Sequence, residues 1–341
     1  MRTEQARGST DRARDDDPAD RSRPRPDRLR QVACWGAAAA TLPYVALKVA
    51  WLTGSEIGMA DPTVLADPAY LVANAITLLL DACVVLLAFA LTDHVARRLP
   101  TCLLVPPLWV ATGLLGPIVA LLPVTLTLID GRARSASQDA LESWVYAVVY
   151  LGFTVQGLLI GVAFALYAVR RWPAVLRGRL GAGPVSPLLP VQRFLAGGLG
   201  ALAAVVAVLN LAYAWGMRAG LQGLADRQST IDRVTLGVYA CFALLVVVGL
   251  PTLVVRRPAR WPAWLPLALT WLGSGAMTGW GLYFLAISAR DPSLTGPGLT
   301  VLAAVKTTAG AAAAVLGTLV VAERLLGDHQ TREDSRATAS R

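Results

Sequence analysis

Apolar stretches of about one bilayer crossing recur eight times along the chain, separated by short polar segments. A hydrocarbon core of roughly 30 Å needs about 20 apolar residues in helical conformation. The stretches are rich in Ala and Leu and do not alternate between polar and apolar positions, which disfavours a β-barrel. We therefore expect transmembrane helices over these ranges: 31–53, 69–92, 102–129, 141–169, 194–216, 232–255, 262–287 and 299–322.

Composition supports this interpretation. The chain has 341 residues, of which 55% are hydrophobic and only 16% are charged. Soluble domains carry about 25% charged residues. The pattern thus predicts an all-α, polytopic membrane protein of about eight transmembrane helices, with the lipid bilayer as its main partner.

Arginine is concentrated in the segments after the second, fourth and sixth spans. The residues are Arg97, Arg98, Arg170, Arg171, Arg177, Arg179, Arg193, Arg256, Arg257 and Arg260. The intervening segments carry more acids than basic residues. Because cytoplasmic loops are rich in Lys and Arg, we expect both termini in the cytoplasm. Much Ala and Arg with little Lys is typical of a bacterial chain from a GC-rich genome, which indicates the plasma membrane.

The net charge of +9 also fits contact with anionic lipid headgroups. No aromatic stacking motif lies among the arginines, so we expect no nucleic-acid partner.

Polar tails flank the membrane region. Residues 1–30 contain nine arginines, seven acids and almost no aliphatic residues, which predicts a disordered cytoplasmic tail. Residues 328–341 form a second polar tail. Between them we expect two membrane halves of four helices each, residues 31–180 and 181–327.

A short internal similarity would fit a repeat of these halves. Residues 47–51 resemble residues 209–213 at a shift of 162 positions, and Arg97-Arg98 resembles Arg256-Arg257 at nearly the same shift. Four spans per unit would give both halves the same orientation, a parallel 4+4 repeat.

Three ionisable residues fall inside predicted spans: Lys48, Asp81 and Lys306. Such residues are costly in a bilayer and are functional candidates by default. At a rise of ~1.5 Å per residue, Asp81 lies near the midplane, while Lys48 and Lys306 lie in the outer half. The first two spans form a hairpin, so Lys48 and Asp81 can face each other.

One interpretation is an outward-facing polar cavity. Asp81 would bind a proton or cation, with Lys48 or Lys306 as its counter-charge. Asn74 and Asn210 in the outer half and Gln156 near the middle of the fourth span complete this predicted substrate- or ion-binding set.

The alternative is purely structural. Both lysines would then extend to the headgroups, and Asp81 would be neutral or held in one static pair. The amides would form hydrogen bonds between helices.

Glycine and proline indicate how the spans pack. Gly157 with Gly161, and Gly275 with Gly279, have the spacing of close helix contacts. The third span contains four prolines, which predicts a kinked or broken helix. They are Pro106, Pro107, Pro117 and Pro123.

Catalytic and cofactor signatures are not found in the sequence. The four cysteines form no CxxC pair, and with two histidines they do not suggest a metal site. Glycine-rich nucleotide loops are absent. We therefore expect no cofactor and lean against an enzyme.

Two function classes stay open: a transporter or permease of unidentified small-molecule substrate, and a non-catalytic scaffold or partner subunit that binds other membrane proteins.

Overall fold

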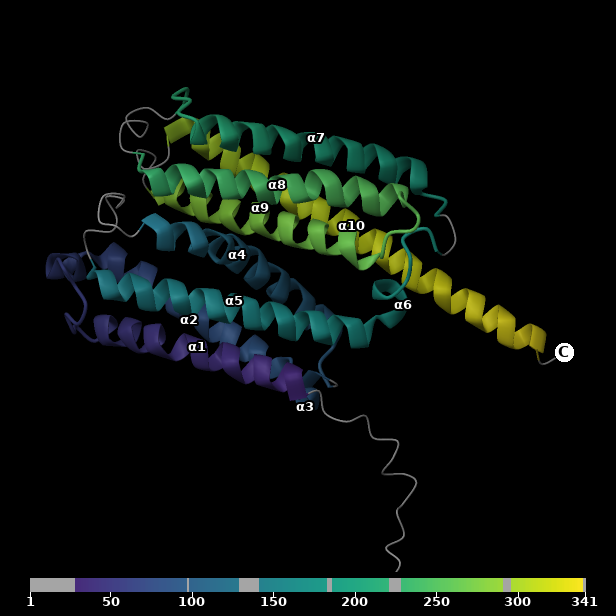
Figure 1. Ribbon diagram of the computed structural model, residues 1–341, viewed down its shortest axis with the longest axis horizontal. Coiled ribbons are helices and arrows are strands. Elements are labelled where there is room, and N and C mark those ends of the chain that lie inside the picture. The colour runs from purple at the N-terminus through teal and green to yellow at the C-terminus, as the bar shows by residue number, and fades with distance from the viewer. Residues whose placement is uncertain are drawn as a thin grey trace, which may run out of the picture.

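The computed structural model describes residues 28–96, 98–128, 141–182, 186–220, 228–290 and 296–339. These residues form helices, with two isolated β-bridges in loops. The long helices run side by side in one bundle (Figure 1). They are α1 (Arg28–Leu52), α2 (Pro68–Ala90), α4 (Thr101–Leu128), α5 (Ser143–Arg171), α7 (Leu189–Ala214), α8 (Thr230–Val255), α9 (Trp264–Arg290) and α10 (Gly296–Ala339).

Short helices lie in the connections. A 3₁₀ helix, η1 (Pro62–Ala66), precedes α2, and α3 (Asp93–Ala96) follows it. A single turn, α6 (Pro173–Leu176), follows α5. The Asp61 side chain caps η1 by accepting the Thr63 N–H at 3.0 Å, and this contact with Thr63 holds the pKa of Asp61 below its ordinary value.

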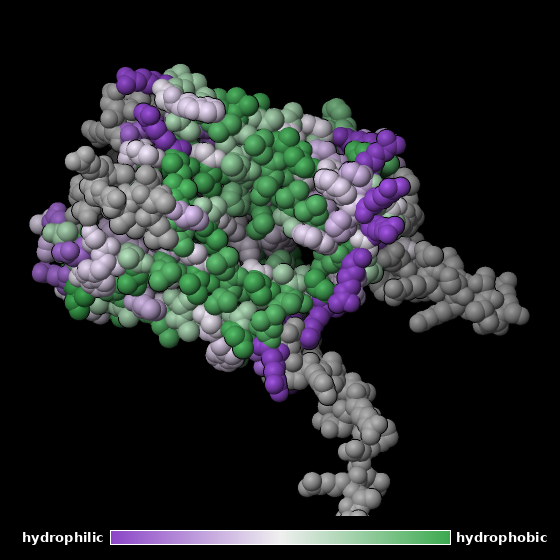
Figure 2. Space-filling view, viewed as in Figure 1, coloured by the Kyte–Doolittle hydropathy of each residue, from purple (hydrophilic) through white to green (hydrophobic). Residues whose placement is uncertain are grey.

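Within the described residues, seven helices are long and apolar enough to cross a membrane: α1, α2, α4, α5, α7, α8 and α10. The all-α, polytopic membrane architecture predicted from the sequence is therefore confirmed. Figure 2 shows the matching surface, with apolar residues over the middle of the bundle and hydrophilic residues gathered towards its two ends.

The seventh predicted span, 262–287, is α9, which has 27 residues but does not reach the hydropathy of the other seven helices. Its residues from Gly273 to Gly279 are all buried. It packs against α4, α8 and α10, so its small and polar residues face protein rather than lipid. Interior packing explains why a helix of membrane length lacks the usual hydropathy.

The helices pack in two groups. In the first, α1 packs against α2 and α5, and α4 against α5. The second consists of α7, α8, α9 and α10, which enclose the largest apolar core. The groups meet where α4 packs against α9 and α8. The predicted repeat and the predicted halves remain predictions, because contacts between helices do not establish them.

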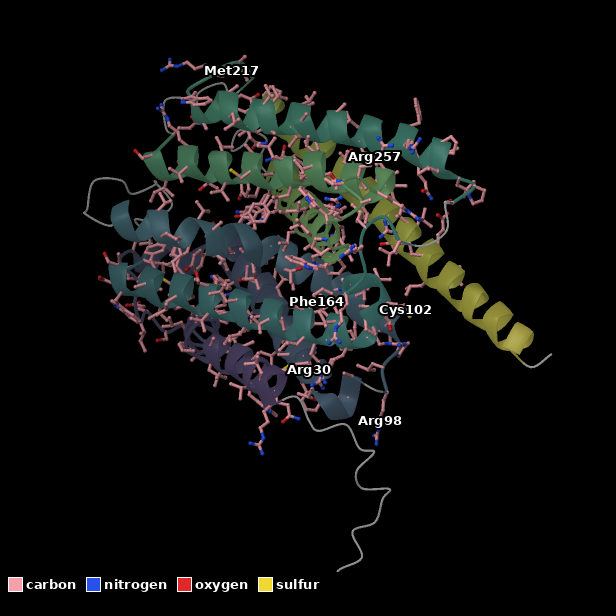
Figure 3. All side chains as sticks on the ribbon, turned by 45° about the vertical axis from the view of Figure 1, so that its right-hand side comes forward. Arg30, Arg98, Cys102, Phe164, Met217 and Arg257 are labelled. Carbon is pink, nitrogen blue, oxygen red and sulfur yellow. The ribbon has the colours of Figure 1, made fainter. Side chains whose placement is uncertain are left out.

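The arginine-rich end of the bundle is the end at which α1 begins and α5 and α8 finish. Figure 3 shows Arg30 and Arg98 towards this end and Met217 at the opposite, far end. Backbone hydrogen bonds join two loops at the arginine-rich end, from Leu180 N to Trp261 O at 2.8 Å and from Ala263 N to Gly178 O at 3.0 Å.

Two expectations about the chain can be compared with the structure. The third span was expected to be kinked or broken, and it is not broken, because α4 is one continuous helix with four prolines. The segment expected as a polar C-terminal tail continues α10 as a helix to Ala339. Of the predicted N-terminal tail, residues 1–27 lie outside the described residues, and residues 28–30 already belong to α1.

Candidate functional site

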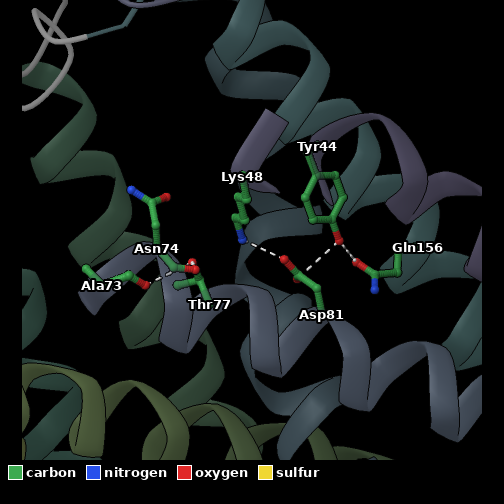
Figure 4. Close-up of polar contacts among 7 residues, drawn as sticks. All are labelled: Tyr44, Lys48, Ala73, Asn74, Thr77, Asp81 and Gln156. Carbon is green, nitrogen blue, oxygen red and sulfur yellow. Dashed lines mark hydrogen bonds and ion pairs between the residues drawn. The ribbon is translucent and has the colours of Figure 1, made fainter. Parts of the chain in front are cut away.

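An ion pair joins α1 and α2 inside the first group of helices. The Lys48 Nζ lies 2.5 Å from Asp81 Oδ2, and the two side chains are 8% and 6% exposed. Figure 4 shows the two side chains meeting between the helices. The pairing suggested by the hairpin of the first two spans is present in the structure.

Helix direction brings the two side chains together although their backbones differ in depth. Lys48 lies about 6 Å from the far end of α1, whereas Asp81 lies ~20 Å into α2 from that end. Side chains lean towards the N-terminus of their own helix. Because α1 and α2 are antiparallel, Lys48 leans away from the far end and Asp81 leans towards it, so the depth difference closes.

Tyr44 extends the pair to a third helix. Its hydroxyl lies 2.7 Å from Gln156 Oε1 on α5 and 3.3 Å from Asp81 Oδ1. Tyr44 and Gln156 are completely buried. We call Tyr44, Lys48, Asp81 and Gln156 the α1–α2–α5 cluster.

Gln156 gives this cluster an unused hydrogen-bond donor. Its Nε2 is buried and has no hydrogen-bond partner in the part of the chain that the structure describes. Tyr44 has one hydroxyl hydrogen and can donate to only one of its two acceptors at a time. An amide turned by 180° would donate from Nε2 to the Tyr44 oxygen and leave the Tyr44 hydrogen for Asp81. The cluster can thus exchange hydrogen bonds without moving a helix.

Aromatic rings surround the ammonium group of the pair. The Lys48 Nζ lies 5.3 Å from the Tyr44 ring centroid and 5.7 Å from that of Phe153. The two rings are themselves in contact, with centroids 4.7 Å apart. Aromatic faces attract a nearby cation, so the two rings add to the contact that Lys48 makes with Asp81.

The two asparagines of the predicted set bond within their own helices. Asn74 donates to the Tyr70 carbonyl at 3.1 Å, and Asn210 donates to the Val206 carbonyl at 2.7 Å. Figure 4 shows Asn74 pointing away from the Asp81 carboxylate. Asn210 belongs to α7, in the other group of helices.

Lys306 also lies apart from Asp81. It is 4% exposed, and its Nζ lies 4.7 Å from the Tyr239 ring centroid and 5.7 Å from that of Phe284. The counter-charge of Asp81 is therefore Lys48 and not Lys306. Both lysine side chains are buried inside the bundle, which does not fit the alternative interpretation in which they extend to the headgroups.

Sequence reasoning missed Tyr44 and Phe153. One local signal for Tyr44 was available, since it precedes Lys48 by four residues and so shares its helix face. Phe153 has no comparable signal, because its role depends on the packing of α5 against α1.

A second polar feature, also missed, lies where α4 meets α9. Indole N–H groups donate across this interface from Trp109 to Ser274 Oγ (3.1 Å), from Trp271 to Thr112 Oγ1 (2.9 Å) and from Trp280 to the Leu114 carbonyl (3.2 Å). These bonds are available because the two backbones approach closely at glycine. A methyl group added at Gly113 would overlap the backbone of Gly275.

The predicted glycine contacts are confirmed at three of four positions. Gly275 and Gly279 pack on α4, and Gly157 packs on Leu115 and Val119 of α4. A methyl group at Gly161 would meet nothing within 4 Å.

Comparisons with known proteins do not assign the chain to a family. No protein-family model, curated protein or solved structure matches the chain. The functional argument therefore depends on the chemistry of the buried residues.

Proposed function

We propose that this multi-pass membrane protein is a transporter of permease type, in which the α1–α2–α5 cluster binds a proton or small cation that drives transport. The observation that carries the proposal is the buried Lys48–Asp81 pair, with Tyr44 and Gln156 attached to it. Ionisable residues inside membrane spans are costly and commonly mark ion pathways.

Cation binding at Asp81 would change the contacts of three helices. A proton on the carboxylate removes its charge and weakens the attraction to Lys48. The Tyr44 hydroxyl then favours Gln156 over Asp81, because a neutral carboxyl is the weaker acceptor. Binding is thereby coupled to the packing of α1 against α2 and α5, which is the linkage that a coupled transporter needs.

Proton movement in vesicles tests this function. The purified protein is reconstituted with a trapped pH-sensitive dye, and a Na⁺ or K⁺ gradient is imposed. We expect the wild type to change the internal pH faster than protein-free vesicles, and Asp81→Asn to reduce this rate to background. The matched control is Cys83→Ser, an exposed position two residues further along α2.

Two results would contradict the proposal. Asp81→Asn, reconstituted in equal amount, could move protons as fast as the wild type. Alternatively, the wild type could match protein-free vesicles under both gradients.

One observation favours the second candidate function, a non-catalytic scaffold or partner subunit. The paired side chains are closed off from solvent, as expected for an ion pair that fixes helix packing. In that case Asp81→Asn would lower the stability of the protein or its recovery with partner membrane proteins, and the wild type would show no proton movement.

We further propose that the arginine-rich end faces the cytoplasm of a bacterial cell, with the protein in the plasma membrane. The support is the arginine distribution, since basic residues accumulate on the cytoplasmic side. Under this orientation the far end, towards which Lys48 lies, faces outwards.

A further inference from the structure

Lys306 differs from Lys48 in having no acidic partner among the described residues. It is 4% exposed, and its Nζ contacts the faces of Tyr239 and Phe284. Within the described residues it makes no ion pair and no hydrogen bond. An aromatic face attracts a cation but carries no net charge, so no described group supplies a counter-charge for a protonated Lys306.

The acid on the same helix as Tyr239 is already engaged elsewhere. Asp232 lies seven residues before Tyr239, which is about two helical turns or 10 Å along α8. Its carboxylate accepts hydrogen bonds from Ser229 N at 2.9 Å and Ser229 Oγ at 2.8 Å in the cap that starts the helix. Asp232 therefore serves the helix N-terminus rather than Lys306.

Depth makes this arrangement costly. Tyr239 and Lys306 are the tenth and eleventh residues of α8 and α10, counted from the far end, so both lie roughly 15 Å below it. That distance is about half of the hydrocarbon thickness. A buried charge normally has a partner of opposite sign.

Two side chains near each other, Lys306 and Tyr239, have donor groups without a hydrogen-bond partner among the described residues. The Lys306 ammonium offers three N–H groups, and the Tyr239 hydroxyl offers one O–H. The Tyr239 hydroxyl also has no hydrogen-bond partner among the described residues. Each residue keeps a small residual exposure, 4% for Lys306 and 5% for Tyr239.

We infer that Lys306 and Tyr239 form a binding site for a small monovalent anion, either a halide or a short carboxylate, within the α7–α10 group. The anion would accept hydrogen bonds from both groups and supply the missing negative charge. One ammonium balances one charge, which disfavours divalent anions. This site is separate from the α1–α2–α5 cluster, and the inference does not depend on the transport proposal.

A groove beside α10 extends from the far end of the bundle towards Lys306. The groove has a volume of about 420 Å³ and runs between α7 and α10. Leu302, one turn before Lys306 on α10, lies in its wall, and Gly220 and Gly298 line it near the far end. Val305, the residue before Lys306, also lines the groove, so the groove runs along the turn of α10 that leads to Lys306.

Thermal unfolding in different salts tests the site. The purified protein is heated in sodium chloride, sodium acetate or sodium gluconate at equal ionic strength, and Tm is followed by tryptophan fluorescence. A ligand that binds only the folded state raises Tm with its concentration. We expect chloride, acetate or both to raise Tm by a few degrees over gluconate in a saturable way, and the two salts distinguish a halide site from a carboxylate site.

Substitutions test whether Lys306 and Tyr239 cause the rise of Tm with anion concentration. Lys306→Met should abolish it, and Tyr239→Phe should require several-fold more anion for the same shift. Thr308→Val is the matched control, because Thr308 is exposed two residues further along α10 and should respond as the wild type does.

The inference is overturned if wild-type Tm is the same in the three salts, or if Lys306→Met keeps the saturable response. Should Lys306→Met fail to fold, Tyr239→Phe still decides, because it keeps the ring and removes only the hydroxyl. An unchanged response in Tyr239→Phe would then contradict the site. The proton assay of Asp81 is a separate measurement, so failure of one proposal leaves the other in place.

Discussion

Two lysines are buried in this bundle but have opposite surroundings. Lys48 contacts a carboxylate, a tyrosine and a phenylalanine, whereas the described contacts of Lys306 are aromatic only. Desolvation is costly for both ammonium groups. The difference is that Asp81 offsets this cost for Lys48, which makes the pair a unit whose parts cannot be removed independently.

This interdependence predicts a non-additive effect on stability. Lys48→Met should destabilise the protein by about 3–5 kcal/mol, because it leaves the Asp81 carboxylate buried without a counter-charge. The double variant Lys48→Met with Asp81→Leu should recover most of that loss, since it removes both charges. Unfolding of the purified variants in detergent measures the free energies, and losses that simply add would contradict the prediction.

At the scale of single residues, the sequence predicted the pairing of Lys48 with Asp81 but not the other contacts of the cluster. The order of the spans places Lys48 and Asp81 on adjacent antiparallel helices, and this was sufficient to predict their pairing. The bond from Tyr44 to Gln156 required knowing that α1 packs against α5. Nothing near either residue in the chain encodes that contact.

Among the helices, α4 and α9 form the main contact between the two groups. Gly113 and Gly275 let the backbones approach, and the tryptophans on both sides donate hydrogen bonds across the interface. Phe164 of α5 adds to this contact by stacking on Trp271, with ring centroids 4.9 Å apart.

Close packing at this interface predicts opposite effects of the same substitution. Gly113→Ala should destabilise the protein by about 1–3 kcal/mol, because its methyl group overlaps the backbone of Gly275. Gly161→Ala, in open space within α5, should stabilise it by up to ~1 kcal/mol through helix propensity. Tm values of both variants in the same detergent provide the check, and a stabilising Gly113→Ala would contradict the described contact.

Helix positions were predictable from apolar run length, and most observed ends lie within a few residues of the expected ones. The exceptions have physical reasons. Proline does not interrupt α4 because each ring removes only its own N–H and neighbouring packing supports the rest. The helix α10 extends beyond the predicted span because a polar segment can continue a helix past its apolar part.

For the whole molecule, the arginine distribution predicts orientation. In a variant with all native cysteines replaced by serine, Thr63→Cys at the far end should react with a membrane-impermeant maleimide in intact cells. Arg177→Cys at the arginine-rich end should react only after the cells are permeabilised. The reverse pattern would contradict the proposed topology.

The arrangement of the helices was the part that sequence could not supply. Span length and loop charge are local quantities, whereas the neighbours of a helix depend on shape. The low hydropathy of α9 is an example, because its row of glycine, serine and threonine is tolerable only between α4, α8 and α10.

The paired loops at the arginine-rich end have a mechanical consequence. The chain passes from the first group of helices to the second through the segment after α5, and hydrogen bonds fasten that segment to the loop between α8 and α9. Relative rotation of the groups is therefore restrained at one end of the bundle. At the other end an exposed ion pair joins the groups, from Arg290 Nη2 at the end of α9 to Asp67 Oδ2 at 3.9 Å. A rocking motion about the α4–α9 contact would therefore separate the helices at that end only by stretching this pair.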